Sequence, residues 1–109
     1  MNSPSGRPSR VAEAEVLALC QEMTITRSEF LRSLPAAVAG VAFAAADGDI
    51  RSLDPAHAWR IALTPLPDLR IALIRLGRFR VEIFLTGYDE PRTRRFLERF
   101  ELYFRRAGG

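Results

Sequence analysis

The stretch of sequence that decides the fold is LRIALIRLGRFRVEIFL, residues 69–85, followed by PRTRRFLERFELYFRR, residues 91–106. In the first segment apolar and charged side chains alternate, which is the two-residue period of a strand with one buried face. In the second segment apolar residues recur every three to four positions, which is the period of an amphipathic helix. The change of period predicts a sheet that packs against a C-terminal helix.

Strand patterns continue toward the N-terminus, and short turn signals separate them. We predict five short strands, at residues 41–46, 50–53, 59–64, 69–76 and 79–86. Asp47-Gly48 is a strong signal for a two-residue hairpin turn, and Asp54-Pro55 indicates a second turn. The run from Pro65 to Asp68 is expected to break the ladder into a loop, and Gly77 to mark a turn or bulge. Short connections between consecutive strands imply an antiparallel sheet.

Two helices are predicted before the first of these strands. Ser9 can cap a helix over residues 10–23, which places Ala12, Val16, Leu19, Cys20 and Met23 on one apolar face. On that face Cys20 would be a buried, inert thiol. Thr26 and Glu29 form a capping box for a second helix that ends at Pro35 or restarts through residues 36–39 before Gly40.

The expected fold class is α+β, a two-layer sandwich in the order α-α-β-β-β-β-β-α. An antiparallel sheet of four to five strands would carry the N-terminal helices and the C-terminal helix on one face. Asp89 is the expected N-cap of the last helix, which would bury Phe96, Leu97, Phe100, Tyr103 and Phe104. Residues 1–9 are expected to form a disordered tail and residues 10–109 a single domain.

Length and composition suit a small cytoplasmic domain. The chain has 109 residues and 48% are hydrophobic, which is enough for an ordinary core without disulfides or metal. Its single cysteine cannot form an internal disulfide, so a reducing compartment is the expectation. No segment is long and apolar enough for a secretory signal or a membrane span, so no membrane partner is predicted.

Charge is distributed unevenly along the chain. All 16 basic residues are arginine, which codon bias in a GC-rich genome explains more simply than function does. Residues 1–54 have a net charge of −2, and residues 55–109 a net charge of +5. The basic second half permits a polyanionic or acidic partner but is weak support for one by itself.

The residues that support catalysis are few. The only histidine, His57, follows a turn, and Cys20 is its sole potential partner for an activated nucleophile. Asp47, Asp49 and Asp54 belong to turns and supply too few ligands for calcium. The sequence contains no metal-binding, phosphate-binding or dinucleotide-binding motif. We therefore predict that the protein is not an enzyme and needs no cofactor or metal.

The face of the predicted sheet that points away from the helices is the remaining candidate site. If Trp59, Ile61, Leu63, Leu69, Ile71, Leu73, Phe79, Val81, Ile83 and Leu85 point inward, mostly polar residues point outward. A solvated face is the simpler interpretation. The alternative is a basic binding surface that contacts an acidic partner protein, another anionic ligand or a second copy of the chain. Its residues would be Arg60, Arg70, Arg78, Arg80 and Phe84.

Two other functions remain open. A nucleic-acid-binding domain could combine these arginines with Phe84, although one aromatic residue is a poor stacking platform. Gly108-Gly109, after a basic approach, resembles the tail of ubiquitin-like sulfur carriers, which implies activation of the C-terminal carboxylate by adenylation. Those carriers extend the tail from a strand of a β-grasp fold, whereas here a helix is predicted immediately before the glycines.

Overall fold

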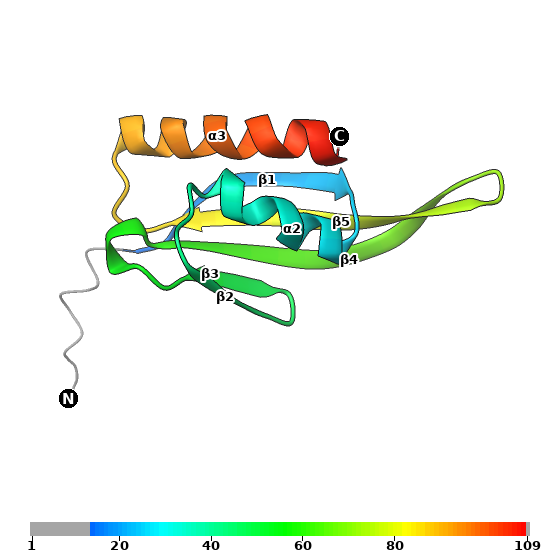
Figure 1. Cartoon of the computed structure of the whole chain (residues 1–109), viewed down its shortest axis with the longest axis horizontal. Helices are drawn as coiled ribbons and strands as arrows, with labels where there is room; N and C mark the ends of the chain where they lie inside the picture. Colours follow the sequence, from blue (N-terminus) through cyan, green and yellow to red (C-terminus); the bar gives the residue numbers. More distant parts are fainter. Residues whose placement is uncertain (1–13, 109) are drawn as a thin grey trace.

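The computed structural model describes residues 14–108 and contains one five-stranded antiparallel sheet with two α-helices on one side (Figure 1). The elements follow one another as β1 (Val16–Thr24), α2 (Arg27–Ala37), β2 (Phe43–Ala46), β3 (Asp49–Ser52), the 3-10 turn η2 (Pro55–His57), β4 (Trp59–Ile71), β5 (Ile74–Leu85) and α3 (Glu90–Gly108). The strand order across the sheet is β1-β5-β4-β3-β2. The α+β class and the antiparallel sheet are therefore as predicted.

The hydrophobic core lies between the two helices and the sheet. Phe30 of α2 and Phe100 of α3 are fully buried, and each packs its ring on Phe104, with ring centroids 4.6 and 4.5 Å apart. The inward alternation predicted for the sheet is confirmed for the residues beneath the helices, where Ile61, Val81 and Ile83 have no exposed surface. Trp59, Leu63 and Leu85 are buried with them.

Local capping signals place both helices where they were expected. Thr26 and Glu29 form the predicted capping box, with each side chain 3.1 Å from the backbone nitrogen of the other residue. Pro35 lies in the last turn of α2, and the helix ends two residues later at Ala37. The carboxylate of Asp89 accepts a hydrogen bond of 2.9 Å from the backbone nitrogen of Arg92, as expected of an N-cap.

The predicted first helix over residues 10–23 is wrong. Residues 16–24 form β1, and the start of the predicted helix lies outside the described residues, as does the predicted tail at residues 1–9. β1 pairs along β5, with Leu19 opposite Ile83 and Cys20 opposite Glu82. Cys20 therefore points away from the helices and is exposed, not buried as predicted.

The helical interpretation failed because the apolar residues of this segment satisfy both periods. Leu19 and Met23 are four residues apart, which fits one helix face and also fits one strand face. A β-bulge between Leu17 and Leu19 further hides the two-residue alternation. Pairing with β5 supplies backbone hydrogen bonds along the whole segment, and this long-range pairing overrides local helix propensity.

The predicted loop at residues 65–68 is also wrong, because β4 runs unbroken from Trp59 to Ile71. β3 pairs with β4 only from Arg60 to Ala62, so beyond that point no described strand pairs with this edge of β4. The N–H of Leu63 still donates a hydrogen bond to the carbonyl of Gly48, just before β3. Because backbone N–H groups of a strand point to alternate edges, the nitrogen of Pro65 lies on the same edge, where no described strand follows. A proline there removes no hydrogen bond of the ladder.

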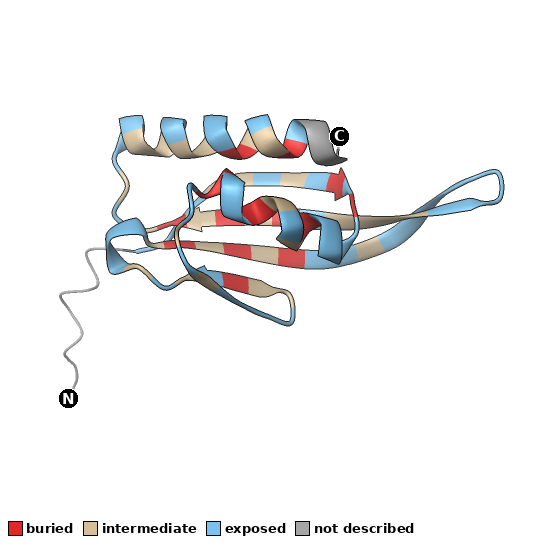
Figure 2. Cartoon of the chain, viewed as in Figure 1, coloured by how far each residue is buried: buried red, intermediate tan, exposed pale blue. Residues whose placement is uncertain are grey.

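β4 and β5 extend past the core as a two-stranded hairpin, here called the arm (residues 66–78). Figure 1 shows the arm projecting beyond both helices, and Figure 2 shows its outer part as exposed. The prediction that Leu69, Ile71 and Leu73 face the helices is therefore wrong; their exposed fractions are 38, 55 and 101%. The turn lies at Ala72, which has a left-handed φ of 56°. Gly77 lies inside β5, opposite the shift in register between Leu66 and Leu69, so of the predicted turn or bulge at Gly77 the bulge is found.

No helix of the described residues is long and apolar enough to cross a membrane.

Candidate binding surface

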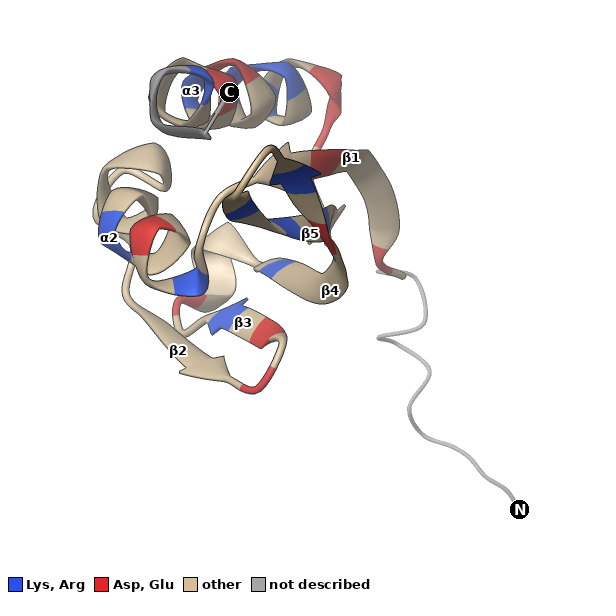
Figure 3. Ribbon diagram, turned by 90° about the vertical axis from the view of Figure 1, so that its right-hand side faces the viewer, with Lys and Arg blue, Asp and Glu red and all other residues tan. Residues whose placement is uncertain are grey.

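The side of the sheet that faces away from α2 and α3, here called the outer face, is not covered by any described element (Figure 3). Strand register places its side chains in rows across the sheet. One row contains Leu17, Phe84, Arg60 and Arg51, on β1, β5, β4 and β3. The outer face therefore brings together residues from segments that are far apart in the sequence.

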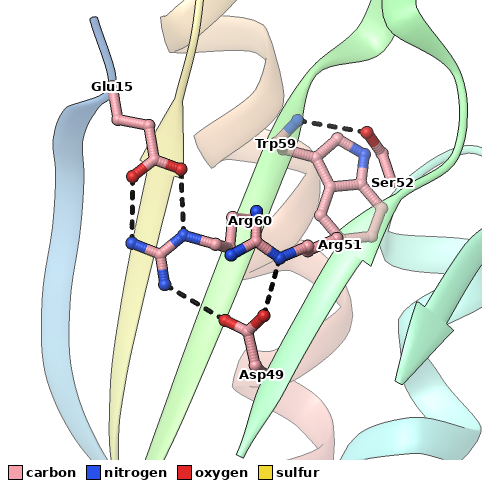
Figure 4. A network of polar contacts seen from close by, with 6 residues as sticks. All are labelled: Glu15, Asp49, Arg51, Ser52, Trp59 and Arg60. Atoms are coloured by element: carbon pink, nitrogen blue, oxygen red, sulfur yellow. Dashed lines mark hydrogen bonds and ion pairs between the residues drawn. The ribbon is translucent and has the colours of Figure 1, made fainter. Parts of the chain in front are cut away.

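Arg60 is the centre of a polar network on this face (Figure 4). Its guanidinium donates two hydrogen bonds to Glu15, of 2.9 and 3.0 Å, and a third of 3.1 Å to Asp49. The same group lies over the Phe84 ring, 4.2 Å from the centroid. Asp49 also accepts a hydrogen bond of 2.8 Å from Arg51. Arg60 thus ties the segment before β1 to β3 across the two central strands.

The network stabilises the ionised forms of its members. Hydrogen bonding from Arg60 lowers the pKa of Glu15, and hydrogen bonding to Glu15 raises the pKa of Arg60. Burial raises the pKa of Asp49, but its hydrogen bonds with Arg60 and Arg51 outweigh this effect, so the pKa is lowered overall. The charged groups of this network are hydrogen-bonded to one another. We call Arg60 a structural clamp because its hydrogen bonds hold separate segments of the chain together.

Acidic groups balance the basic character predicted for this face. Arg78 pairs with Glu22 at 2.8 Å, just as Arg60 and Arg51 pair with their carboxylates. The outer face carries four arginines and four carboxylates, namely Arg51, Arg60, Arg78, Arg80, Glu15, Glu22, Asp49 and Glu82. Four of the predicted site residues, Arg60, Arg78, Arg80 and Phe84, do share this face.

Arg70, the fifth predicted residue, does not join them. The β4–β5 register shifts by one residue between Leu66 and Leu69, so Leu69 pairs with Leu76 and Arg70 with Arg75. Because β5 alternates without interruption, Leu76 is on the side of Arg78 while Arg75 and Arg70 are on the other side. The bulge therefore reverses the predicted orientation of this part of β4: Leu69 and Ile71 lie on the side of the outer face, and Arg70 lies on the opposite side.

The same shift gives the arm one apolar side. Leu69 and Leu76 form one cross-strand pair and Ile71 and Ile74 the next, all on the side that continues the outer face. Ile71 and Ile74 are 55 and 58% exposed, and Leu73 at the tip is fully exposed. This apolar side of the arm was not predicted from the sequence. An alternating pattern indicates which residues share a face of a strand, but it does not indicate whether another element covers that face. The two prolines, Pro65 and Pro67, were the available signal that this strand lacks a neighbour on one edge.

The structure does not bring the candidate catalytic residues together. Cys20 lies on the outer face, whereas the His57 ring sits in η2, where it is 3.1 Å from the Asp54 carboxylate. Asp54 also accepts a hydrogen bond from the backbone of Ala56, which lowers the pKa of its carboxyl group and marks it as a turn residue. In the part of the chain that is described, no three His, Cys, Asp or Glu residues are grouped to hold a metal ion.

The Arg60 network predicts an acid-sensitive fold. Glu15 and Asp49 have lowered pKa values in the folded state, so their contribution to stability is present above the unfolded pKa values, near 4, and is lost as the pH falls through the folded ones. We expect the melting temperature to fall below about pH 4.5. Glu15→Gln should make that fall shallower, whereas Glu98→Gln, on the exposed part of α3, should not. Identical pH profiles for the two variants would contradict the clamp.

The chain matches no protein-family model, no curated protein and no solved structure. Its function must therefore be argued from the surface itself, where two features stand out: an internally paired outer face and an arm with an uncovered apolar side.

Proposed function

We propose that the protein is a non-enzymatic binding module whose arm docks onto an acidic partner protein, with the adjoining outer face as the rim of the contact. The observation that carries this proposal is the cluster of Ile71, Leu73 and Ile74, which are all more than half exposed. Monomeric proteins seldom expose contiguous apolar side chains unless these have a partner. A protruding hairpin is also a shape that a groove or a sheet of another protein can accept.

The energetics favour docking as the role of these side chains. They contribute little to the core of their own chain, because the arm lies beyond the helices. Fully burying one such side chain is worth about 1.5–3 kcal/mol. Three of them in one contact could therefore supply a large part of the affinity of a specific complex, after the cost of association.

The charge of the arm favours an acidic partner over a second copy. Arg78 and Arg80 lie on the same side as the apolar residues and Arg70 and Arg75 on the opposite side, and Asp68 is the one acidic residue between positions 66 and 80. Arg75 pairs with Asp68 at 3.7 Å, and within the described residues Arg70 and Arg80 have no ion pair. Two arms side by side would bring like charges together, which is unfavourable. An acidic groove would neutralise them.

The alternative functions have less support. For nucleic acid, base stacking needs an open aromatic face, and the Arg60 guanidinium lies over the Phe84 ring. For a Gly-Gly carrier, Gly108 belongs to α3, and Gly109 lies outside the described residues. Both alternatives remain predictions from the sequence.

A photocrosslinking experiment tests the proposal. A photoreactive amino acid is placed at Leu73, and at Leu102 on α3 as the matched control, since both side chains are exposed. The variants are irradiated in the cells of origin, and the crosslinked protein is identified, purified and titrated against the wild-type chain. We expect a crosslink from position 73 alone, to a protein with an acidic surface, and an affinity that falls with added salt.

A shortened variant then separates binding from folding. Replacing residues 70–75 by Asn-Gly joins Leu69 to Leu76 through a two-residue hairpin turn and removes the apolar tip. We expect its free energy of unfolding to stay within about 0.5 kcal/mol of wild type, as for other changes outside a core, and binding to be lost. Unchanged binding, a crosslink to a second copy of the chain, or a crosslink to nucleic acid would each overturn the proposal.

A further inference from the structure

A cleft on the helix side of the molecule has the chemistry of a small-molecule site. It has a volume of about 360 Å³ and lies between the C-terminal end of α2, the η2 turn and the first half of α3. Val38, Val41, Trp59 and Phe96 form apolar walls. The volume is at the lower end of the range for ligand pockets, which suits a molecule smaller than a typical drug. None of the residues of the arm lines it.

Three arginines of α3 border this cleft. Arg92, Arg95 and Arg99 are three and four residues apart, so they follow one another along a single side of the helix. Backbone carbonyls hold two of them: Arg92 donates to Ala56 at 2.9 Å and Arg99 to Ala36 at 2.7 Å. Among the described residues, no aspartate or glutamate lines the cleft. This differs from the outer face, where carboxylates pair with the arginines.

Aromatic rings stack on two of these three cations. The Arg92 guanidinium lies 4.1 Å from the centroid of the Tyr88 ring, and that of Arg99 lies 5.2 Å from the centroid of the Tyr103 ring. Stacking fixes the direction of a guanidinium without neutralising it. Arg95 lies between them on the helix, and no ion pair with another described residue engages it. Such preorganised cations beside apolar walls favour an anion that carries an apolar group.

Trp59 lines the cleft and is almost completely buried. The residue is 3% exposed, and its ring packs between Phe43 and Phe96, with centroids 5.9 and 6.4 Å away. Its indole Nε1 is buried and has no hydrogen-bond partner among the described residues. Buried polar groups are normally satisfied, so this unpaired donor is a cost that the fold tolerates at this position.

We infer that the cleft binds a small amphipathic anion, with its apolar body against Val38, Trp59 and Phe96 and its carboxylate or phosphate group at Arg95. Arg92 and Arg99 flank the head group on either side. Both kinds of head group offer the oxygen pairs that a guanidinium fork binds, so the shared chemistry is an acyl or alkyl chain that ends in an oxyanion. The inference does not depend on the arm, because the two surfaces share no residue.

The single tryptophan makes the cleft directly observable. Because Trp59 lies in the wall, a ligand should change its fluorescence, and no other tryptophan contributes to the signal. Octanoate, octyl phosphate and octanol are titrated separately into the full-length protein, and calorimetry confirms each dissociation constant. We expect saturable binding of at least one of the two anions, at least about tenfold tighter than octanol. The preferred anion identifies the natural head group.

Three variants at two neighbouring arginines of α3 locate the site. Arg95→Glu should weaken binding of the preferred anion by at least about tenfold, and Arg95→Gln should weaken it less. Arg94→Glu, an exposed neighbour that does not line the cleft, should leave binding within about twofold of wild type, apart from long-range screening. Equal losses in the Arg94 and Arg95 variants, binding of octanol as tight as that of both anions, or no saturable binding would overturn the inference. Circular dichroism and urea unfolding of each variant show that lost binding is not lost folding.

Discussion

Replacing Phe100 by alanine is expected to lower the free energy of unfolding by about 3–5 kcal/mol. Phe100 has no exposed surface and joins Phe30 and Phe104 in the ring cluster that fixes both helices to each other. Truncation removes the transfer free energy of the ring and leaves a cavity, and a close-packed core relaxes only in part to fill it. Small domains are stable by about 5–15 kcal/mol, so this one change removes a large fraction of the total.

Leu102→Ala is the matched control for this prediction, because Leu102 lies two residues away on the same helix and is 51% exposed. We expect it to change the free energy of unfolding by no more than about 0.5 kcal/mol. Urea denaturation, followed by circular dichroism, measures both variants. If the two variants lost the same free energy, α3 would be packed with a different face toward the sheet, and the cleft beside its arginines would have no basis.

The second large effect is expected on the outer face. Arg60→Ala should lower the free energy of unfolding by about 1–2 kcal/mol, since it removes charge-assisted hydrogen bonds to two carboxylates. It also uncovers the ring of Phe84 and leaves Glu15 without its cation, while Asp49 keeps its ion pair with Arg51. Partial exposure of the pair, whose side chains are 21 and 41% exposed for Arg60 and Glu15, keeps the effect below that of a buried ion pair.

Arg80→Ala provides the comparison, because Arg80 shares the outer face but has no ion pair among the described residues. We expect Arg80→Ala to change stability by less than about 0.5 kcal/mol. Thermal and urea unfolding of both variants give the answer. The sequence placed both residues in one binding surface, and the two variants test whether Arg60 differs from Arg80 in stabilising the fold. Equal effects on stability would remove that distinction.

The segments that were predicted best are those in which local pattern and tertiary environment agree. The residues from Phe79 to Leu85 alternate between core and solvent, and both neighbouring strands and the helices above follow that alternation. The capping signals at Thr26 and Asp89 were also reliable, because they depend on contacts within a few residues of the chain. A sequence pattern predicts structure well where the local preference of a segment agrees with its tertiary contacts.

The segments that were predicted wrongly depend on a distant partner. Residues 16–24 are a strand because β5 lies beside them, although the two are about sixty residues apart in the sequence. Arg70 changes sides because of a one-residue bulge opposite Gly77, and although Gly77 indicated a turn or bulge, the pairing with β5 decides which residues of β4 change sides. Ile71 was expected to face the helices, but the shifted register places it with Ile74 on the side that continues the outer face, which no described element covers. Each error concerns a contact with a distant segment of the chain.

The sequence by itself determined the class of the fold, the starts of its helices and the inward residues of β5, since these follow from periodicity and from hydrogen bonds between near neighbours. The tertiary structure alone decided the identity of β1, the exposure of the arm and the arrangement of the two groups of arginines. Arg60 meets carboxylates and Arg95 does not, although both lie on elements with ordinary patterns. The physical reason is that burial and charge pairing are properties of contacts between distant segments, and the chain specifies them only when it has folded.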